Sequence, residues 1–491
     1  MNSLLENLEN ANNFKRTENG ALAHKTTKSA VLDLFAFGGA YRNRTEDDCV
    51  FLFKKAFDED PELALKCLFY LRDIRGGQGE RRFFRVCFNW IASKVPGIAE
   101  KNIENVAVFG RYDDILYSCE GTPAMNAALS FVKIQIGLDL ECKTPSLLAK
   151  WLPSENASSA DTKRMGNIVR EYLGLTHKQY RKILSELRSR INIVERLMSQ
   201  NRWEEIEFDK IPSKAGLIYK NAFARRDIIA KKFEAFAKDE NTTVNAAALY
   251  PYDIVLKARR ADSGNATDRA MLDKFWENQI DVLEGAPCKM MCVVDTSGSM
   301  RGWGSTNVAP IDMAIGLGMY CAERIGGPFK NHYISFSSRP QLIKVEGVDF
   351  YDKVRRIYRT NLCENTNLVA TFNMLKEATL KAKPEDRLDT VVVISDMEID
   401  YMSQGRWSKE RTATEMERVR KDWEAAGLKM PRLVYWNVDA RQDTILDLGP
   451  NVTFCSGASP MIFKQIATGK TGWDLFLETV ANNERYSVVT I

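Results

Sequence analysis

The second part of the chain alternates short apolar runs with longer amphipathic stretches, and this rhythm limits the folds open to it. Two of the runs, Met290–Val294 and Val391–Ile394, are uniformly apolar and of strand length. Such runs are typical of parallel strands, which are buried on both faces. The pattern predicts a mainly parallel, doubly wound α/β sheet with helices on both faces. Its predicted strands and helices lie at 289–294, 310–325, 331–337, 367–382, 389–395, 411–426, 431–437, 452–455, 459–467 and 473–483.

The residues before about 285 lack this strand-then-helix rhythm. They have the pattern of amphipathic helices broken by Gly, Pro and polar turns. Helices joined by short turns favour an α-solenoid of degenerate helical hairpins. We therefore expect an all-α, HEAT-like helical repeat domain over 1–284 and an α/β domain over 285–491. Examples of the expected helices are 62–72, 81–93, 124–136 and 178–199.

Composition narrows the class of protein. The hydrophobic content of 45%, the charged content of 27% and the net charge of +4 describe an ordinary globular protein, so any nucleic-acid binding must be local. There is no apolar run of membrane-spanning length, and the N-terminus lacks the pattern of a secretory signal. The ten cysteines are scattered, and several lie in apolar runs. Reduced thiols of this kind favour a cytoplasmic protein.

Oxygen-bearing side chains follow both apolar runs. Asp295, Ser297 and Ser299 come directly after the first run, and Asp396 closes the second. Thr366 offers a further hydroxyl just before a predicted helix. Carboxylate and hydroxyl oxygens suit Mg²⁺, and ligands gather at the carboxyl ends of parallel strands. We predict a Mg²⁺ or Mn²⁺ site here; the alternative is a set of helix N-caps with no metal.

Two basic stretches in the first part of the chain are candidates for binding RNA. A glycine-rich turn at 76–79 is flanked by Arg72, Arg75 and Arg81, and its amides with these guanidinium groups could hold phosphate. The alternative is an ordinary turn whose arginines pair with Asp73 and Glu80.

The second stretch, residues 210–232, carries seven basic residues and one acid, with Tyr219 and Phe223 interleaved. Clustered basic residues with aromatic neighbours fit an RNA footprint, although a charge run is usually a solvated helix face. The RNA-binding candidates in this stretch are Lys210, Lys214, Lys220, Arg225 and Arg226.

The five metal candidates resemble the metal-ion-dependent adhesion site of von Willebrand factor A domains. Asp295, Ser297 and Ser299 match its first motif, Thr366 its second and Asp396 its third. Further segments resemble an uncharacterised bacterial and phage group related to the Ro ribonucleoproteins, in which a TROVE-like helical module precedes a von Willebrand A domain. These segments are 19–21 with 29–35, 71–81, 110–114, 149–153, 211–215, 394–398 and 456–460.

The resemblance implies a ring of helical repeats that takes single-stranded RNA ends or small structured RNAs. It also implies that Mg²⁺ at the adhesion site captures an Asp or Glu from a partner protein.

No nucleophile and base stand together, because His24, His177 and His332 lie in unrelated contexts. We therefore expect a non-catalytic, cytoplasmic RNA-binding scaffold. The alternative is a metal-dependent protein assembly module without RNA, and a metal-dependent nuclease is a third possibility.

Overall fold

The computed structural model describes residues 12–191, 193–262, 264–286, 288–301, 308–336, 339–360, 367–400 and 414–491. The chain divides into two compact units. The sheet unit holds the residues up to 67 together with 246–483, and the helical unit holds 68–245 together with 484–491. These units do not coincide with the domain boundary expected between 284 and 285. The residues up to 67 and residues 246–284 belong to the sheet unit, and residues 484–491 belong to the helical unit.

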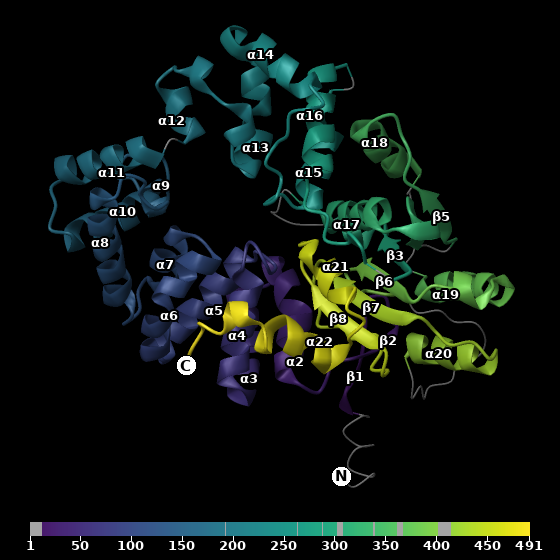
Figure 1. Cartoon of the computed structure of the whole chain (residues 1–491). Helices are drawn as coiled ribbons and strands as arrows, with labels where there is room; N and C mark the ends of the chain where they lie inside the picture. The colour runs from purple at the N-terminus through teal and green to yellow at the C-terminus, as the bar shows by residue number, and fades with distance from the viewer. Residues whose placement is uncertain are drawn as a thin grey trace. The chain divides into compact units, whose positions relative to one another are not determined.

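The helical unit is built from helices (Figure 1). The end of α4 (Pro61–Arg72) also belongs to this unit, which begins at residue 68. The helix expected at 178–199 is two helices, α11 and α12, and the others expected in this region begin within one residue of their predicted starts. The helices are α5 (Arg81–Lys94), α6 (Pro96–Phe109), α7 (Tyr112–Cys119), α8 (Met125–Glu141), α9 (Leu148–Trp151), α10 (Ala160–Tyr172), α11 (His177–Ile191), α12 (Val194–Ser199), α13 (Ser213–Arg225) and α14 (Asp227–Lys238).

The last residues of the chain pack against α4 and α6 within the helical unit. The guanidinium of Arg485 binds both carboxylate oxygens of Asp73, and the ring of Tyr486 stacks on Phe109 with centroids 5.4 Å apart. The Asn102 side chain accepts the amide of Thr490 at 3.2 Å. These contacts explain why residues 484–491 belong to the helical unit.

A six-stranded sheet forms the centre of the sheet unit, in the order β5-β4-β3-β6-β7-β8. All neighbouring strands are parallel except the edge strand β5, which is antiparallel to β4. The predicted mainly parallel sheet is therefore confirmed. The strands are β3 (Met290–Asp295), β4 (His332–Phe336), β5 (Gln341–Lys344), β6 (Thr390–Ser395), β7 (Arg432–Asn437) and β8 (Val452–Ser456).

Helices cover both faces of this sheet (Figure 1). On one face, Val293, Val391 and Val393 pack with Phe372 of α19 (Leu368–Lys381) and Trp423 of α20 (Glu415–Ala425). The opposite face is covered by α17 (Pro310–Arg324) and α21 (Met461–Ile466). Gly318 of α17 lies so close to the sheet that an added Cβ would be 2.5 Å from Val294. The ring of Trp436 lies 4.8 Å from that of Phe463 in α21.

The N-terminal residues extend the sheet unit. The hairpin of β1 (Phe14–Arg16) and β2 (Leu22–His24) exchanges backbone hydrogen bonds with Ile445, and Gly39 packs on β8. The Gly39 amide donates to Ser456 Oγ at 2.9 Å, and an added Cβ would lie 2.6 Å from the Ser456 carbonyl oxygen. The remaining helices of this unit are α2 (Ala30–Phe37), α3 (Glu46–Glu59), α15 (Pro251–Arg260), α16 (Ala266–Glu277), α18 (Phe350–Thr360) and α22 (Gly472–Phe476).

Within the part of the chain that the structure describes, no helix combines the length and apolarity needed to cross a membrane.

Candidate functional site

The candidate metal ligands lie where the order of the strands reverses. Chain order runs outward from β3 in one direction through β4 and β5, and in the other through β6, β7 and β8. Asp295 ends β3, and Asp396 directly follows β6, its hydrogen-bonded neighbour. In open α/β sheets ligands bind at this switch point, beyond the carboxyl ends of the strands. The topology therefore brings together the two Asp residues that the sequence singled out.

Asp295 is fully buried and is held from two sides. Its Oδ1 accepts the amide of Ser297 at 2.9 Å, and its Oδ2 accepts the hydroxyl of Ser395 at 2.6 Å. The hydroxyl oxygens of Ser297 and Ser299 lie 3.0 Å apart. The loop after β3 thus fixes one carboxylate and two hydroxyls at a single end of the sheet.

Asp396 is also fully buried and lies against a cation from the loop after β7. Its Oδ1 accepts the amide of Glu398 at 3.2 Å, and its Oδ2 lies 3.0 Å from a terminal nitrogen of Arg441. The same nitrogen of Arg441 lies 3.0 Å from the carboxylate of Glu18. Asp396, Arg441 and Glu18 therefore form a chain of alternating charge that leads from the site to the N-terminal hairpin.

Burial dominates the electrostatics of the two carboxylates. It raises the pKa of Asp295, and the negative charge of Asp396 raises it further, against the hydrogen bonds from Ser395 and Ser297. Burial also raises the pKa of Asp396, while Arg441 and a hydrogen bond from Ser299 lower it. Two buried carboxylates beside each other are costly unless positive charge compensates them. Arg441 supplies such charge to Asp396, and a bound cation would supply it to Asp295.

The N-terminal hairpin is fastened beside Asp396. The amide of Glu18 donates to Glu398 Oε2 at 2.6 Å, and the hydroxyl of Thr17 donates to the carbonyl of Ile399 at 2.8 Å. The hydroxyl of Thr444 donates to the other oxygen of Glu398 at 3.2 Å. Glu398 therefore organises the loop after β6.

Sequence reasoning missed three residues of this region: Ser395, Arg441 and Glu18. The signal for Ser395 was available, since its hydroxyl stands between the second apolar run and Asp396. No local signal marks Glu18 or Arg441, because their partners are distant in sequence: Arg441 contacts Asp396 across 45 residues, and Glu18 contacts Glu398 across 380.

Thr366, the expected fifth ligand, lies outside the described residues. The following helix begins where the sequence predicted, and Asn367 caps it by accepting the amide of Ala370 at 2.8 Å. Among the described residues, no three His, Cys, Asp or Glu side chains come together in a way that could hold a metal ion. A metal at this site would depend on two carboxylates combined with serine hydroxyls.

The structure corrects the prediction that Arg72 faces RNA. Arg72 is only 2% exposed, and its Nε and a terminal nitrogen donate to Asp114 at 2.9 and 2.6 Å. Arg85 donates to the other oxygen of Asp114 at 2.6 Å. Arg72 therefore stabilises the packing of α4 on α7 in place of binding phosphate.

The glycine-rich turn uses its amides internally. Gln78, Gly79 and Glu80 donate to the carbonyls of Tyr70, Asp73 and Leu71 respectively. Gly77 packs against α4, where an added Cβ would lie 1.9 Å from the Tyr70 carbonyl oxygen. This turn is consequently a packed connection between helices, although Arg75 and Arg81 on either side of it are exposed.

The basic stretch at 210–232 is divided between the core and the surface. Lys220 is only 3% exposed, so the structure corrects its assignment to an RNA-binding surface. Lys210 is exposed and forms an ion pair with Glu207. Lys214 and Arg225 share the exposed side of α13, and Arg226 is exposed with its guanidinium 4.8 Å from the Trp203 ring centre. Phe223 is buried, as a core aromatic would be.

Comparisons with known proteins give two family matches, both to domains of unknown function. The family described as a domain of unknown function (DUF2828) matches residues 17–118 and 145–300, and the one described as DUF7788 matches 289–484. The second match covers the sheet and the candidate metal site.

The chain is similar to an uncharacterised protein, L728, of Acanthamoeba polyphaga mimivirus. The two are 28% identical over 504 residues, covering 92% of this chain and 84% of the viral protein. Among solved structures, the crystal structure of the Deinococcus radiodurans Ro (RSR) protein matches with a TM-score of 0.49 and 14% identity. That match covers 90% of this chain and all of the Ro chain.

Proposed function

This chain belongs to the family described as a domain of unknown function (DUF2828), and we propose that it is a non-catalytic binding scaffold. Its sheet unit would hold Mg²⁺ or Mn²⁺ in a von Willebrand A-like adhesion site that captures a carboxylate from a partner protein. Its helical unit would hold RNA through exposed basic side chains. The metal site carries the proposal, because Asp295 and Asp396 meet at the switch point of the sheet with Ser297 and Ser299 beside them.

The donor set fits Mg²⁺ in chemistry and in spacing. Mg²⁺ takes oxygen ligands at about 2.0–2.1 Å in octahedral geometry, so neighbouring ligands lie roughly 3 Å apart. The hydroxyl oxygens of Ser297 and Ser299 are 3.0 Å apart. Asp295, Ser297, Ser299 and Asp396 would hold the ion, with Thr366 as the proposed fifth ligand. When bound, the ion would supply positive charge with an open position for an incoming Asp or Glu.

The metal site is tested by titrating Mg²⁺ and Mn²⁺ into the full chain and following heat of binding and thermal unfolding. Binding to the folded state raises the unfolding temperature as the metal concentration rises above the dissociation constant. We expect this stabilisation in the natural protein and its loss in Ser297→Ala/Ser299→Ala. A natural protein that gains no stability in millimolar Mg²⁺ or Mn²⁺ would refute the metal site.

The proposed RNA binding rests on local positive charge. Lys214 and Arg225 lie on one exposed side of α13, and Arg226, Lys231 and Lys232 are exposed around the start of α14. The alternative, a metal-dependent assembly module without RNA, makes no use of these residues. Purification without nuclease treatment separates the two, because a scaffold for RNA should carry nucleic acid that ribonuclease removes. RNA that is cut when held with Mg²⁺ would instead favour a nuclease.

A further inference from the structure

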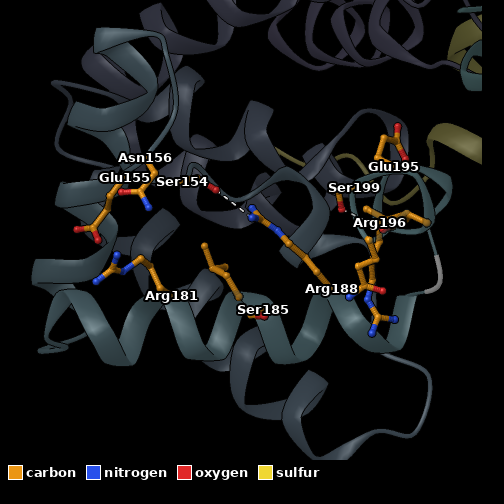
Figure 2. Close-up of a pocket in the computed structure, with 12 residues that line it drawn as sticks. Ser154, Glu155, Asn156, Arg181, Ser185, Arg188, Glu195, Arg196 and Ser199 are labelled. Carbon is orange, nitrogen blue, oxygen red and sulfur yellow. Dashed lines mark hydrogen bonds between the residues drawn. The ribbon is translucent and has the colours of Figure 1, made fainter. Parts of the chain in front are cut away.

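A polar cleft of about 440 Å³ lies in the helical unit, and none of the RNA-binding candidates named so far is among its lining residues (Figure 2). Its walls come from α11, from α12 and from the turn at 154–156. Three arginines line it: Arg181, Arg188 and Arg196. We propose that this cleft binds the phosphodiester backbone of single-stranded RNA. The inference rests on the proposed RNA function and gives it a specific site.

The helix geometry places two of the arginines on the same side of α11. Arg181, Ser185 and Arg188 are spaced by four and then three residues, which brings them to one face of the helix. Figure 2 shows Arg181 and Arg188 rising from that face, with Ser185 between them. Arg196 reaches the cleft from α12. A row of guanidinium groups along a cleft matches a chain of phosphates better than it matches a single anion.

Arg188 forms a rigid part of the wall. Its three nitrogens donate to the carbonyl of Ala149 at 2.7 Å, the hydroxyl of Ser154 at 2.9 Å and the carbonyl of Leu152 at 2.9 Å. None of these acceptors carries a negative charge, so the positive charge of Arg188 is not neutralised by them. Its contribution to a bound phosphate is therefore electrostatic, in a site that is already organised.

Arg181 and Arg196 keep donors for a ligand. Arg181 is exposed, and among the described residues it uses its Nε alone, which donates to the carbonyl of His177 at 3.2 Å. Arg196 donates one terminal nitrogen to the carbonyl of Ser189 at 2.7 Å. Both partners are again neutral carbonyls. Each guanidinium can therefore offer further N–H groups to phosphate oxygens.

Two carboxylates also line the cleft, and their contacts differ. Glu155 is 7% exposed and accepts Arg170 and His177, each at 2.8 Å, so its charge is compensated from outside the cleft. Glu195 accepts the hydroxyl of Tyr219 at 3.5 Å, and its other oxygen is buried without a partner among the described residues. An acceptor of this kind suits a 2′-hydroxyl or a base N–H group, both of which are donors of a ribonucleotide.

The test measures binding of a labelled oligouridylate of about ten nucleotides by fluorescence anisotropy, at about 50 and 200 mM salt. Arg181→Glu/Arg196→Glu should lower the affinity at least tenfold. Because two phosphate contacts are lost, the log–log salt slope should become shallower by roughly 1.4. Lys182→Glu is the matched control, since it reverses an exposed charge on the same helix outside the lining of the cleft. Its affinity should stay within threefold of the natural protein.

Circular dichroism and thermal unfolding check that the double variant folds, and Arg181→Gln/Arg196→Gln replaces it if charge reversal prevents folding. If the double variant binds RNA as tightly as the Lys182→Glu control, the proposal that RNA binds in this cleft is overturned, and RNA binding elsewhere on the protein is left intact. Failure of the natural protein to bind RNA at low salt overturns the proposed RNA function itself. Binding of uridine 5′-monophosphate without the oligonucleotide would show a mononucleotide site and also overturn the inference.

Discussion

The guanidinium of Arg441 lies 3.0 Å from the carboxylate of Asp396, where it supplies positive charge beside the candidate metal site. The same guanidinium pairs with Glu18 of the N-terminal hairpin at an equal distance. A side chain shared between two carboxylates can compensate either of them. Arg441 therefore connects the electrostatics of the site to a segment that lies near the other end of the chain.

We expect Arg441→Met to strengthen Mg²⁺ binding on the order of tenfold, because it removes a positive charge that competes with the ion for Asp396. Glu18→Gln should have the opposite effect, since Arg441 would then pair with Asp396 alone. Isothermal titration with Mg²⁺ measures both changes. Two variants that shift the affinity in the same direction would contradict this role for Arg441.

Asp295→Ala should abolish the stabilisation by Mg²⁺ while leaving a cooperatively folded protein. The carboxylate would be the main charge partner of a bound metal, and its removal also relieves the repulsion from Asp396. Ser395→Ala is the control: it removes the hydroxyl that orients Asp295 but keeps the charge, so metal binding should weaken without being lost. Loss of cooperative unfolding in Asp295→Ala would mean that Asp295 is structural.

Arg72→Ala should destabilise the helical unit by about 3 kcal/mol, because Asp114 would remain buried with only part of its compensating charge. Arg85 still contacts Asp114, which keeps the loss below that of a fully isolated charge. Chemical denaturation measures the free energy of unfolding. Arg75→Ala, at a nearby exposed position, should change it by less than about 0.5 kcal/mol. Equal effects of the two variants would show that the buried ion pair does not stabilise the fold.

Asp273 of α16 predicts a pH dependence in a region away from the metal site. Burial, followed by the charges of Asp349 and Glu277, raises the pKa of Asp273 to about 6, while the amide of Phe350 and Lys353 act in the opposite direction. A folded-state pKa above the unfolded value means that ionisation is disfavoured in the fold. The ionisation of Asp273 therefore lowers the free energy of unfolding as pH rises from about 4 to about 6.

Asp273→Asn removes that penalty and keeps an oxygen to accept the Phe350 amide, which now donates to Oδ1 at 2.6 Å. The variant should unfold at a higher temperature than the natural protein at pH 7. The difference should vanish near pH 4, where Asp273 is protonated. Because the side chain is partly exposed, solvent limits the gain at pH 7 to about 1 kcal/mol. A difference that does not vary with pH would exclude the ionisation of Asp273 as its cause.

Local pattern predicted the elements whose burial is uniform along the chain. The strands ending at Asp295 and near Asp396 have no polar face, so each was visible as a continuous apolar run. The edge strand β5 was missed, because its sequence mixes polar and apolar residues and most of its side chains are exposed. The helix α18 was missed although its buried residues Phe350, Val354 and Ile357 recur at helical spacing.

Charge patterns were less reliable guides than apolar ones. The sequence could not separate Arg72 and Lys220, which are buried, from Lys214 and Arg225, which are exposed on α13. On α13, helix periodicity partly separates the exposed residues from the core, since Lys214 and Arg225 fall on the side opposite Phe223. The burial of Arg72 depends on Asp114, a partner 42 residues away that no local pattern indicates.

Lys214→Ala/Arg225→Ala should weaken RNA binding and reduce its salt dependence. Each lost phosphate contact on single-stranded RNA lowers the magnitude of the log–log salt slope by roughly 0.7. A filter-binding series across salt concentrations, with single-stranded and duplex RNA, gives affinity and slope together. Lys238→Ala is the matched control, because Lys238 is exposed and already pairs with Glu234 at 2.6 Å. If both variants bind as tightly as the natural protein, α13 is not an RNA-binding surface. If the natural protein binds neither RNA at low salt, the metal-dependent assembly module takes the place of the RNA scaffold.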